Sequence, residues 1–419
     1  MFPQPQNRIP LSECKVLFDY FDKFDHLRKL FSLNGTDCSV YKYVVDDVDF
    51  YVYDSKFAKI TTNMIDYNCG FCKSNGFTIK FGKTLDDDPD WCPLGPEIMD
   101  LEISVNGCPK VGGKNCRFCY KNNTDAAPTN MTFDTFRKII DTFPASLNQI
   151  AFGITGTKTN PDFPKMLEYC KEVGIVPNYT MSGADLDDEI IDVTRRTCGA
   201  VAISCYEGNK ELCYDTIAKL HDKAPNVHVN MHIVLSKGTI DHVMDVLKDL
   251  SKTEKRIVVD HKTKTARFIR TCKDERLHYL RNVVFLRIKP VGRASKMDTT
   301  IGLDMFEKVI NYCNDNYINY GFDSCTAPDV VRVLNKQGKS ELSKYCESCE
   351  SGRFSSYISV NAEYWHCSFA EHDSRIKPVN VLDYKNATEW WAGDEMKQFR
   401  KDMNLRNEMH CPLFKLTAD

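Results

Sequence analysis

The pattern of hydrophobic and polar positions changes once along this chain, near Pro96. Before it, Ser39 to Asn63 is rich in Val, Tyr and Phe with charged interruptions, a pattern that predicts short antiparallel strands. This β-rich segment ends in the acidic, turn-prone sequence LDDDPDWCPLGPE. Such a stretch predicts a boundary rather than a strand or helix.

After Pro96, short β-branched runs alternate with helical patterns such as PDFPKMLEYCKEVG and TIDHVMDVLKDL. The runs predict six strands: Leu101–Val105, Gln149–Phe152, Ile175–Thr180, Ala200–Ser204, Val229–Leu235 and Val283–Ile288. This alternation predicts βαβ units with right-handed crossovers, and therefore an α/β fold with a parallel sheet. Active sites of such sheets lie at the carboxyl ends of the strands.

Between the fifth and sixth predicted strands lies an insertion, Ser251–Arg281, whose sequence RIVVDHKTKTARFI predicts a basic hairpin. From Lys252 to Lys296 the chain has fourteen Lys or Arg residues and four Asp or Glu. Because the whole chain carries a formal charge of −3, this is a local basic patch on a protein with no general attraction to nucleic acid. The insertion can be interpreted as a solvated surface hairpin or as an element that docks the substrate.

Length and composition refine this picture. At 419 residues the chain exceeds one ordinary domain, and we expect three parts: 1–96, 97–303 and 304–419. With 42% hydrophobic and 27% charged residues the composition is that of a soluble globular protein, and no apolar run approaches the ~20 residues that span a membrane. Nineteen cysteines without a secretory signal pattern favour metal binding in a reducing cytoplasm over a disulfide scaffold.

Three of these cysteines carry the most information. Cys108, Cys116 and Cys119 follow the first predicted strand, with Gly112 and Gly113 in the longer spacer, which lets it fold back. Three thiolates leave one position of a tetrahedral or four-iron site open, whereas structural zinc sites close with four protein ligands. The trio therefore predicts a catalytic iron–sulfur cluster, with zinc completed by a remote ligand as the alternative.

The segment resembles the cluster loop of radical S-adenosylmethionine (SAM) enzymes, which has three cysteines and an aromatic residue just before the last. Here Phe118 is that aromatic residue, and the spacing is Cx7CxxC instead of the usual Cx3CxxC. Further segments of the resemblance follow in order between residues 97 and 300: AFGITGTKTNPDFPKML, TMSG, AISCYEGN and FLRIKPVGRAS.

The resemblance implies a partial (β/α)6 radical SAM barrel with a [4Fe-4S] cluster on Cys108, Cys116 and Cys119. An open iron chelates SAM, and a reduced cluster cleaves it to a 5′-deoxyadenosyl radical that abstracts a substrate hydrogen, which makes the chain an enzyme. The resemblance also implies the residues that contact SAM. They are Phe118 on the adenine; Gly153, Thr155 and Gly156 near the amino group; Ser204 at the ribose; and Lys289 and Arg293 at the carboxylate.

The carboxyl-terminal part contains a second cysteine motif. YCESCESGRFSSYISVNAEYWHCSF has a CxxC, a predicted hairpin and another cysteine, and it resembles the SPASM and twitch extensions of peptide-modifying radical SAM enzymes. The resemblance implies a small iron–sulfur domain with one auxiliary [4Fe-4S] cluster. Its ligands would be Cys346, Cys349 and Cys367, with Cys325 preferred to Cys411 as the fourth. A structural zinc in the same positions is the alternative.

The other cysteines give weaker signals. Cys69, Cys72 and Cys92 suggest a third metal site but have no clear fourth ligand. His232 is more simply a core histidine than a ligand. A last set falls on predicted helices or strands and fits small buried apolar residues: Cys170, Cys198, Cys205, Cys213, Cys272 and Cys313.

These observations favour a cytoplasmic radical SAM enzyme that modifies a peptide or protein side chain and takes electrons from an external reductant such as flavodoxin or ferredoxin. The resemblance also allows a small-molecule dehydrogenase or a cofactor-biosynthesis enzyme. A hypothesis from another class is a zinc-stabilised protein whose basic patch contacts nucleic-acid phosphates. That hypothesis accounts for the carboxyl-terminal cysteines but not for a three-ligand loop on a βα scaffold.

Overall fold

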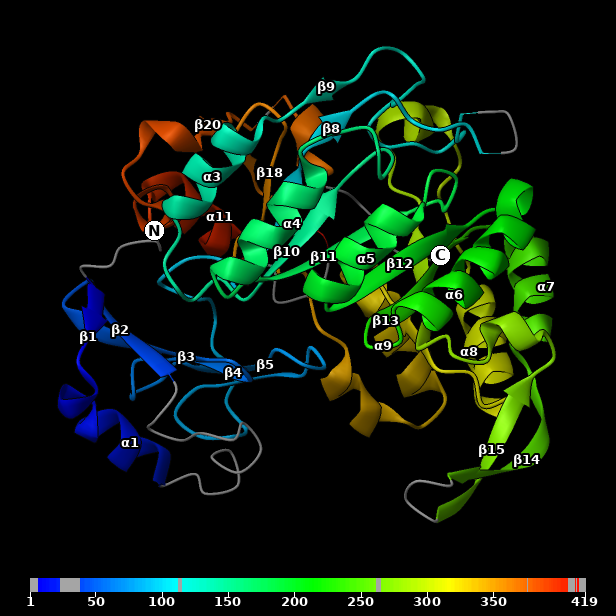
Figure 1. The fold of residues 1–419 in the computed structure, drawn as a ribbon, viewed down its shortest axis with the longest axis horizontal. Coiled ribbons are helices and arrows are strands. Elements are labelled where there is room, and N and C mark those ends of the chain that lie inside the picture. Colours follow the sequence, from blue (N-terminus) through cyan, green and yellow to red (C-terminus); the bar gives the residue numbers. More distant parts are fainter. Residues whose placement is uncertain are drawn as a thin grey trace.

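The computed structural model describes residues 7–22, 38–111, 115–260, 265–374, 376–405, 411 and 413. Figure 1 shows an amino-terminal sheet beside a larger α/β body, with the carboxyl-terminal segment lying along that body. In the described part of the chain, no helix is both long enough and apolar enough to cross a membrane.

The amino-terminal sheet is antiparallel and has its strands in sequence order, as the pattern before Pro96 predicts. Its strands are β1 (Arg8–Ile9), β2 (Cys38–Val45), β3 (Val48–Ser55), β4 (Ala58–Thr62), β5 (Asn68–Cys72) and β6 (Thr78–Phe81). Helix α1 (Lys15–Asp22) packs Leu17 and Phe21 against Val40 and Tyr53 on one face of this sheet. Burial of these side chains stabilises the pair of layers.

The larger sheet has ten strands in the order β17-β16-β13-β12-β11-β10-β7-β18-β19-β20. From β17 to β18 every neighbouring pair is parallel. The first seven strands in that order are β17 (Tyr320–Phe322), β16 (Asn282–Arg287), β13 (His228–Leu235), β12 (Ala200–Cys205), β11 (Val176–Met181), β10 (Gln149–Gly153) and β7 (Ile98–Glu102). Five predicted strands are confirmed to within one residue at each end, and the α/β class is confirmed.

The first predicted strand, Leu101–Val105, is displaced. β7 begins at Ile98 and ends at Glu102, and only Ser104–Val105 continues, as the short strand β8 that pairs with β9 (Thr129–Asn130). Met99 and Leu101 are buried, whereas Asp100 and Glu102 alternate with them and face the opposite side. Because these acidic residues interrupt the apolar run, the sequence pattern alone begins the strand too late.

Helices pack against the parallel strands and form one continuous core with them. They are α3 (Phe133–Asp141), α4 (Phe163–Glu172), α5 (Asp188–Thr197), α6 (Lys210–Lys223), α7 (Ile240–Leu250), α8 (Leu303–Asp315) and α9 (Ala327–Lys336). Side-chain caps start two of them: Thr132 accepts the backbone N–H of Thr135 in α3, and Asp187 accepts that of Ile190 in α5.

The carboxyl-terminal segment extends the same sheet. β18 (Ser355–Ile358) pairs in parallel with β7, and β19 (Glu363–Trp365) and β20 (Val379–Asn380) continue antiparallel. Helices α10 (Ala387–Trp391) and α11 (Asp394–Leu405) follow. Strand pairing therefore joins the predicted barrel and the predicted auxiliary part, and their boundary near residue 303 stays a prediction.

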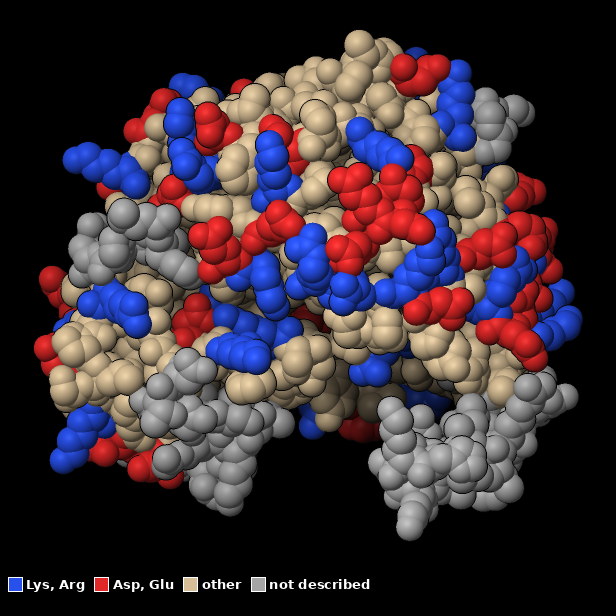
Figure 2. Space-filling model, in the orientation of Figure 1, with Lys and Arg blue, Asp and Glu red and all other residues tan. Residues whose placement is uncertain are grey.

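The insertion between β13 and β16 forms the predicted hairpin. β14 (Lys252–Asp260) pairs antiparallel with β15 (Thr265–Cys272), and the two project away from the sheet (Figure 1). Elsewhere Lys and Arg side chains are interspersed with Asp and Glu over the visible face (Figure 2). Seven of the fourteen Lys and Arg side chains of the basic patch lie outside the described residues, and the role of the patch stays a prediction.

Candidate functional site

Residues 108–119, the three-cysteine loop, lie between β8 and β9 at the carboxyl end of β7. The two arms of the loop are joined by backbone bonds from Gly107 N to Ala126 O (2.8 Å) and from Cys108 N to Thr124 O (2.9 Å). Gly107 has a φ of +62°, and a Cβ there would lie 2.9 Å from Thr159 Cγ2, so this turn requires glycine. The loop thus occupies the predicted edge of the sheet.

The three thiols of this loop influence one another. Burial, and then the neighbouring Cys116 and Cys119, raise the pKa of Cys108 to about 11. Burial and then Cys119 also raise the pKa of Cys116. Arg293 opposes both shifts because its positive charge favours the thiolates. The loop therefore brings the predicted trio together beside one cation.

Arg293 fixes the backbone of the loop. Its Nε donates to Cys116 O (2.8 Å), its Nη2 donates to Asn123 O (2.9 Å), and its backbone N donates to Cys119 O (3.0 Å). The preceding Gly292, with a φ of +58°, lies so close that a Cβ would come within 2.5 Å of Cys119 O. The sequence predicts that Arg293 holds the SAM carboxylate. In the structure its side chain donates instead to the backbone carbonyls of Cys116 and Asn123.

The turn after β10 lies beside the first cysteine. Thr155 Oγ1 donates to Asn106 O (2.7 Å), and a Cβ on Gly156 would lie 3.1 Å from Pro109 Cδ and 2.5 Å from Asp185 Oδ2. Gly153, the last residue of β10, packs on the backbone of Glu102. All three predicted residues of this segment therefore lie near the base of the three-cysteine loop.

Asp185, which the sequence analysis did not single out, also lies beside this loop. Its Oδ2 accepts the backbone N–H of Lys158 (3.0 Å), and its charge contributes to the raised pKa of Cys108. Its Oδ1 is buried and has no hydrogen-bond partner among the described residues. A buried carboxylate oxygen without a donor carries a desolvation cost, which a bound donor removes.

A cavity of about 140 Å³ opens against the other side of the loop. Phe118 and Tyr206 line it, with their ring centroids 5.6 Å apart. Tyr206 follows β12 directly, and burial and then the nearby Cys116 raise its pKa. Ser204 precedes Tyr206 by two residues, and that spacing was the available sequence signal.

Cys205 and His242 form a second pair in the wall of this cavity. Cys205 Sγ lies 3.8 Å from His242 Nε2. Cys213, and then His242 against the opposing effect of burial, lower the pKa of Cys205. The sequence predicts that Cys205 and Cys213 are ordinary apolar core residues. It does not predict the contact between Cys205 and His242, because His242 is distant in sequence.

Lys289 lies away from the three-cysteine loop. It is buried, forms an ion pair with Asp323, and has its Nζ 4.8 Å from the centroid of Phe369. The charges of Asp323, Cys325 and Cys367 each raise its pKa, against the opposing effect of burial. The structure thus places Lys289 among the carboxyl-terminal cysteines and not where the SAM carboxylate was predicted.

Four carboxyl-terminal cysteines influence one another, and we call them the tail cysteine group: Cys325, Cys349, Cys367 and Cys411. Burial raises the pKa of Cys325 to about 12 and that of Cys349 to about 11, and Cys411 contributes to both shifts. Cys346 differs, because its raised pKa comes from burial and Glu347 alone. Electrostatic effects thus link the alternate residue Cys411 to the other three, and the choice between Cys411 and Cys346 as a ligand stays a prediction.

The remaining CxxC is divided between two environments. Cys69 is buried on β5 near Cys92 and Glu97, which raise its pKa after burial does, whereas Cys72 contacts Ser74 at the surface. Across the described ranges, no three His, Cys, Asp or Glu side chains are arranged to hold a single metal ion. This holds for the three-cysteine loop and the tail cysteine group as well, so the third metal site suggested by Cys69, Cys72 and Cys92 stays a prediction, as theirs do.

A buried network connects the three-cysteine loop to the tail. Lys121 Nζ lies 3.0 Å from Glu102 Oε1, donates to the Tyr357 hydroxyl (2.7 Å) and pairs with Glu371. The Tyr357 hydroxyl in turn donates to Glu102 Oε2 (2.9 Å). Lys121 follows Cys119 by two residues, and sequence reasoning had no signal for partners more than 200 residues away.

Comparisons with known proteins identify the fold. No protein-family model and no curated protein matches the sequence. The structure is similar to that of SuiB from Streptococcus suis bound to S-adenosylmethionine, with a TM-score of 0.54 and 11% identity over 74% of this chain and 68% of that one. SuiB bound to its precursor peptide SuiA gives a TM-score of 0.55 and 11% identity over 77% of this chain and 75% of that one.

Proposed function

We propose that this chain, whose fold confirms the predicted resemblance to the radical SAM superfamily, is an enzyme that reductively cleaves SAM and abstracts a hydrogen atom from a peptide or protein substrate. The observation that carries the proposal is the gathering of Cys108, Cys116 and Cys119 beside the guanidinium of Arg293. When bound, a four-iron cluster supplies the electron that cleaves the sulfonium to a 5′-deoxyadenosyl radical.

The donor set fits such a cluster. Cys108, Cys116 and Cys119 supply three thiolates, and Arg293 both holds the loop backbone and favours the ionised thiols. The cluster would lie at the carboxyl end of the parallel sheet, which we propose is the partial (β/α)6 barrel of residues 97–303.

Nearby side chains fit the polar and aromatic parts of SAM. The unpartnered Oδ1 of Asp185 would accept from the ammonium group and so supply the acidic residue that the GITG segment lacks. Thr155 and Gly156 would shape the same turn, Ser204 would contact the ribose, and Phe118 would pack on the adenine. Arg293 would act mainly by positioning the loop.

The tail cysteine group supports an auxiliary four-iron cluster. We propose Cys325, Cys349, Cys367 and Cys411 as its ligands, with Cys411 in place of Cys346. Buried Lys289 beside this group would offset the negative charge of a thiolate-bound cluster. Zinc bound by the same thiols is the competing proposal, and iron and zinc analysis separates the two.

The SuiB structure with a bound precursor peptide supports a peptide substrate, and a small-molecule radical SAM dehydrogenase is the alternative. We propose a cytoplasmic protein reduced by flavodoxin or ferredoxin, because iron–sulfur ligands must stay as thiols. The rival zinc-stabilised nucleic-acid-binding protein would be colourless after anaerobic purification.

Anaerobic purification of matched variants tests these assignments. The wild-type protein should contain about eight irons per chain, for two four-iron clusters. Cys119→Ala should lose the loop iron and all SAM cleavage, whereas Cys349→Ala should lose only the tail iron. Equal iron losses at both positions together with zinc in the wild type would contradict the proposal.

A further inference from the structure

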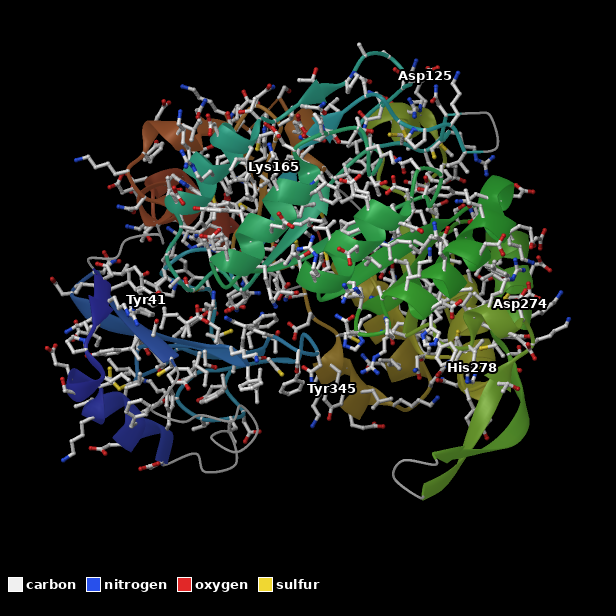
Figure 3. The ribbon with its side chains drawn as sticks, viewed as in Figure 1. Tyr41, Asp125, Lys165, Asp274, His278 and Tyr345 are labelled. Carbon is white, nitrogen blue, oxygen red and sulfur yellow. The ribbon has the colours of Figure 1, made fainter. Side chains whose placement is uncertain are left out.

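A second cavity, of about 310 Å³, lies at the opposite ends of the strands from the three-cysteine loop. Ile98 and Gln149, the first residues of β7 and β10, line it, together with Lys80 of β6 and the segment Glu347–Phe354. Three distant parts of the chain therefore meet here, in a volume on the scale of small-ligand sites. Figure 3 places Tyr345, which ends the short helix η7 (Ser340–Tyr345), on the side that faces the amino-terminal sheet.

The ionisable groups that line this cavity are mainly acidic. Its carboxylates are Asp88, Glu97, Glu347 and Glu350, and its cations are Lys80 and Arg353. This set has a formal charge of −2, since four acidic groups face two basic ones.

The two cations are already engaged. Lys80 Nζ lies 2.8 Å from Glu350 Oε1, 3.5 Å from Glu97 Oε2 and 4.1 Å from the centroid of Phe354. Arg353 donates to Asp90 O (2.5 Å) and Ser348 Oγ (3.3 Å). Glu97 and Glu350 thus share one lysine, which leaves one excess negative charge in that set and one among Asp88, Glu347 and Arg353.

Glu347 lies in the cavity wall together with the carboxylates of Glu350 and Asp88. Carboxylates in this arrangement favour a bound positive charge.

An unsatisfied acceptor lies in the same wall. Asn148 is 3% exposed, and its Nδ2 donates to Cys69 Sγ (3.8 Å). Its Oδ1 has no hydrogen-bond partner in the described part of the chain. A buried amide oxygen in this state is stabilised by any ligand that brings an N–H group.

We propose that this cavity binds an organic cation through a primary ammonium or guanidinium group. Such a group carries the positive charge that balances the excess carboxylates and the N–H donors that Asn148 Oδ1 lacks. A free amine and a basic peptide side chain share this chemistry. The site is independent of the three-cysteine loop and of the reaction proposed there.

Binding here would act on the tail. Glu347 and Glu350 flank Cys349, a member of the tail cysteine group, and Lys80 ties the same segment to the amino-terminal sheet. An occupied cavity would hold the amino-terminal sheet, the start of the barrel and the Cys349 segment in one arrangement.

Isothermal titration calorimetry of the full-length protein with agmatine, and separately with an N-acetyl-lysine amide, tests the proposal. We expect binding of at least one probe and none of N-acetyl-norleucine amide, a neutral analogue of the lysine derivative that lacks the amine. Agmatine alone would identify a free amine as the ligand, and the lysine derivative alone a peptide side chain. Absence of binding by both cations, or equal binding of the neutral analogue, would overturn the proposal.

Two substitutions locate the site. Glu347→Gln should weaken binding about tenfold, because it removes one of the excess charges, whereas Glu341→Gln, on η7 outside the cavity, should not change it. Asn148→Asp keeps the side-chain size and adds a carboxylate, so it should tighten binding. Unchanged affinity in both Glu347→Gln and Asn148→Asp would place the ligand elsewhere and contradict the proposal.

Discussion

The three-cysteine loop and the tail cysteine group bring thiols together in different ways. The loop takes three from the twelve consecutive residues 108–119, whereas the tail takes four from positions spread over 325–411. In the loop, Arg293 bonds to the backbone around the thiols; in the tail, Lys289 lies among the thiols as a buried charge. Local spacing therefore determines the first group, and the three-dimensional fold determines the second.

Among these substitutions, Arg293→Ala should have the largest effect. The effect should be mainly on the three-cysteine loop. It removes two side-chain hydrogen bonds to loop carbonyls, which together contribute about 3 kcal/mol, so loop iron and SAM cleavage should both fall more than tenfold. Iron content and 5′-deoxyadenosine release measure this. Arg117→Ala, which removes one exposed bond to Gly238 O, is the matched control and should retain both. Similar losses in the two variants would show that Arg293 has no special role.

Lys121→Met should disturb both regions, because Lys121 connects them. It leaves Glu102 and Glu371 buried without their cation, at a cost of about 3 kcal/mol in the free energy of unfolding. Urea unfolding measures the loss. Lys158→Met, which breaks an exposed pair with Asp187, should cost much less. Equal losses would mean that the network does not connect the two regions.

The pH dependence of stability tests β13, which lies between the two regions. Burial lowers the pKa of His232 to about 4. Between pH 6.5 and pH 4 this histidine is therefore neutral in the folded state and protonated in the unfolded state. This contribution is present above pH 6.5 and is lost as the pH falls towards 4. Wild-type stability should drop by about 2 kcal/mol between pH 7 and pH 5 through this residue.

His232→Gln should remove that part of the pH dependence, as measured by urea unfolding at the two pH values. His221→Gln, on α6, should leave it in place. A pH dependence that is the same in His232→Gln as in the wild type would show that His232 is not responsible.

Cys411→Ala and Cys346→Ala sharpen the comparison within the tail and should have the smallest effect on SAM cleavage. Cys411→Ala should lose tail iron because it belongs to the group, and Cys346→Ala should keep it. Iron analysis and the visible absorption of the anaerobic proteins distinguish them. The reverse result would restore Cys346 as the ligand.

Much of the parallel sheet was predictable because its strands are short β-branched runs with clear ends. β17 was missed, since a run of three residues resembles a loop in sequence, whereas the predicted carboxyl-terminal hairpin is confirmed as β18 paired antiparallel with β19. The roles of Lys289 and Arg293 were not predictable, because both lie near one sequence motif yet point to different cysteine groups. The positions of Asp185 and Tyr206 beside the three-cysteine loop were likewise not predictable. They depend on which turns the sheet brings together, and the spacing of residues in the sequence does not encode that arrangement.

The most direct test of the central claim is the release of 5′-deoxyadenosine by the anaerobic, iron-loaded protein given SAM and dithionite. The proposed function predicts release by the wild-type protein and none by Cys108→Ala, Cys116→Ala or Cys119→Ala. An iron-loaded wild-type protein that leaves SAM intact under these conditions would contradict it.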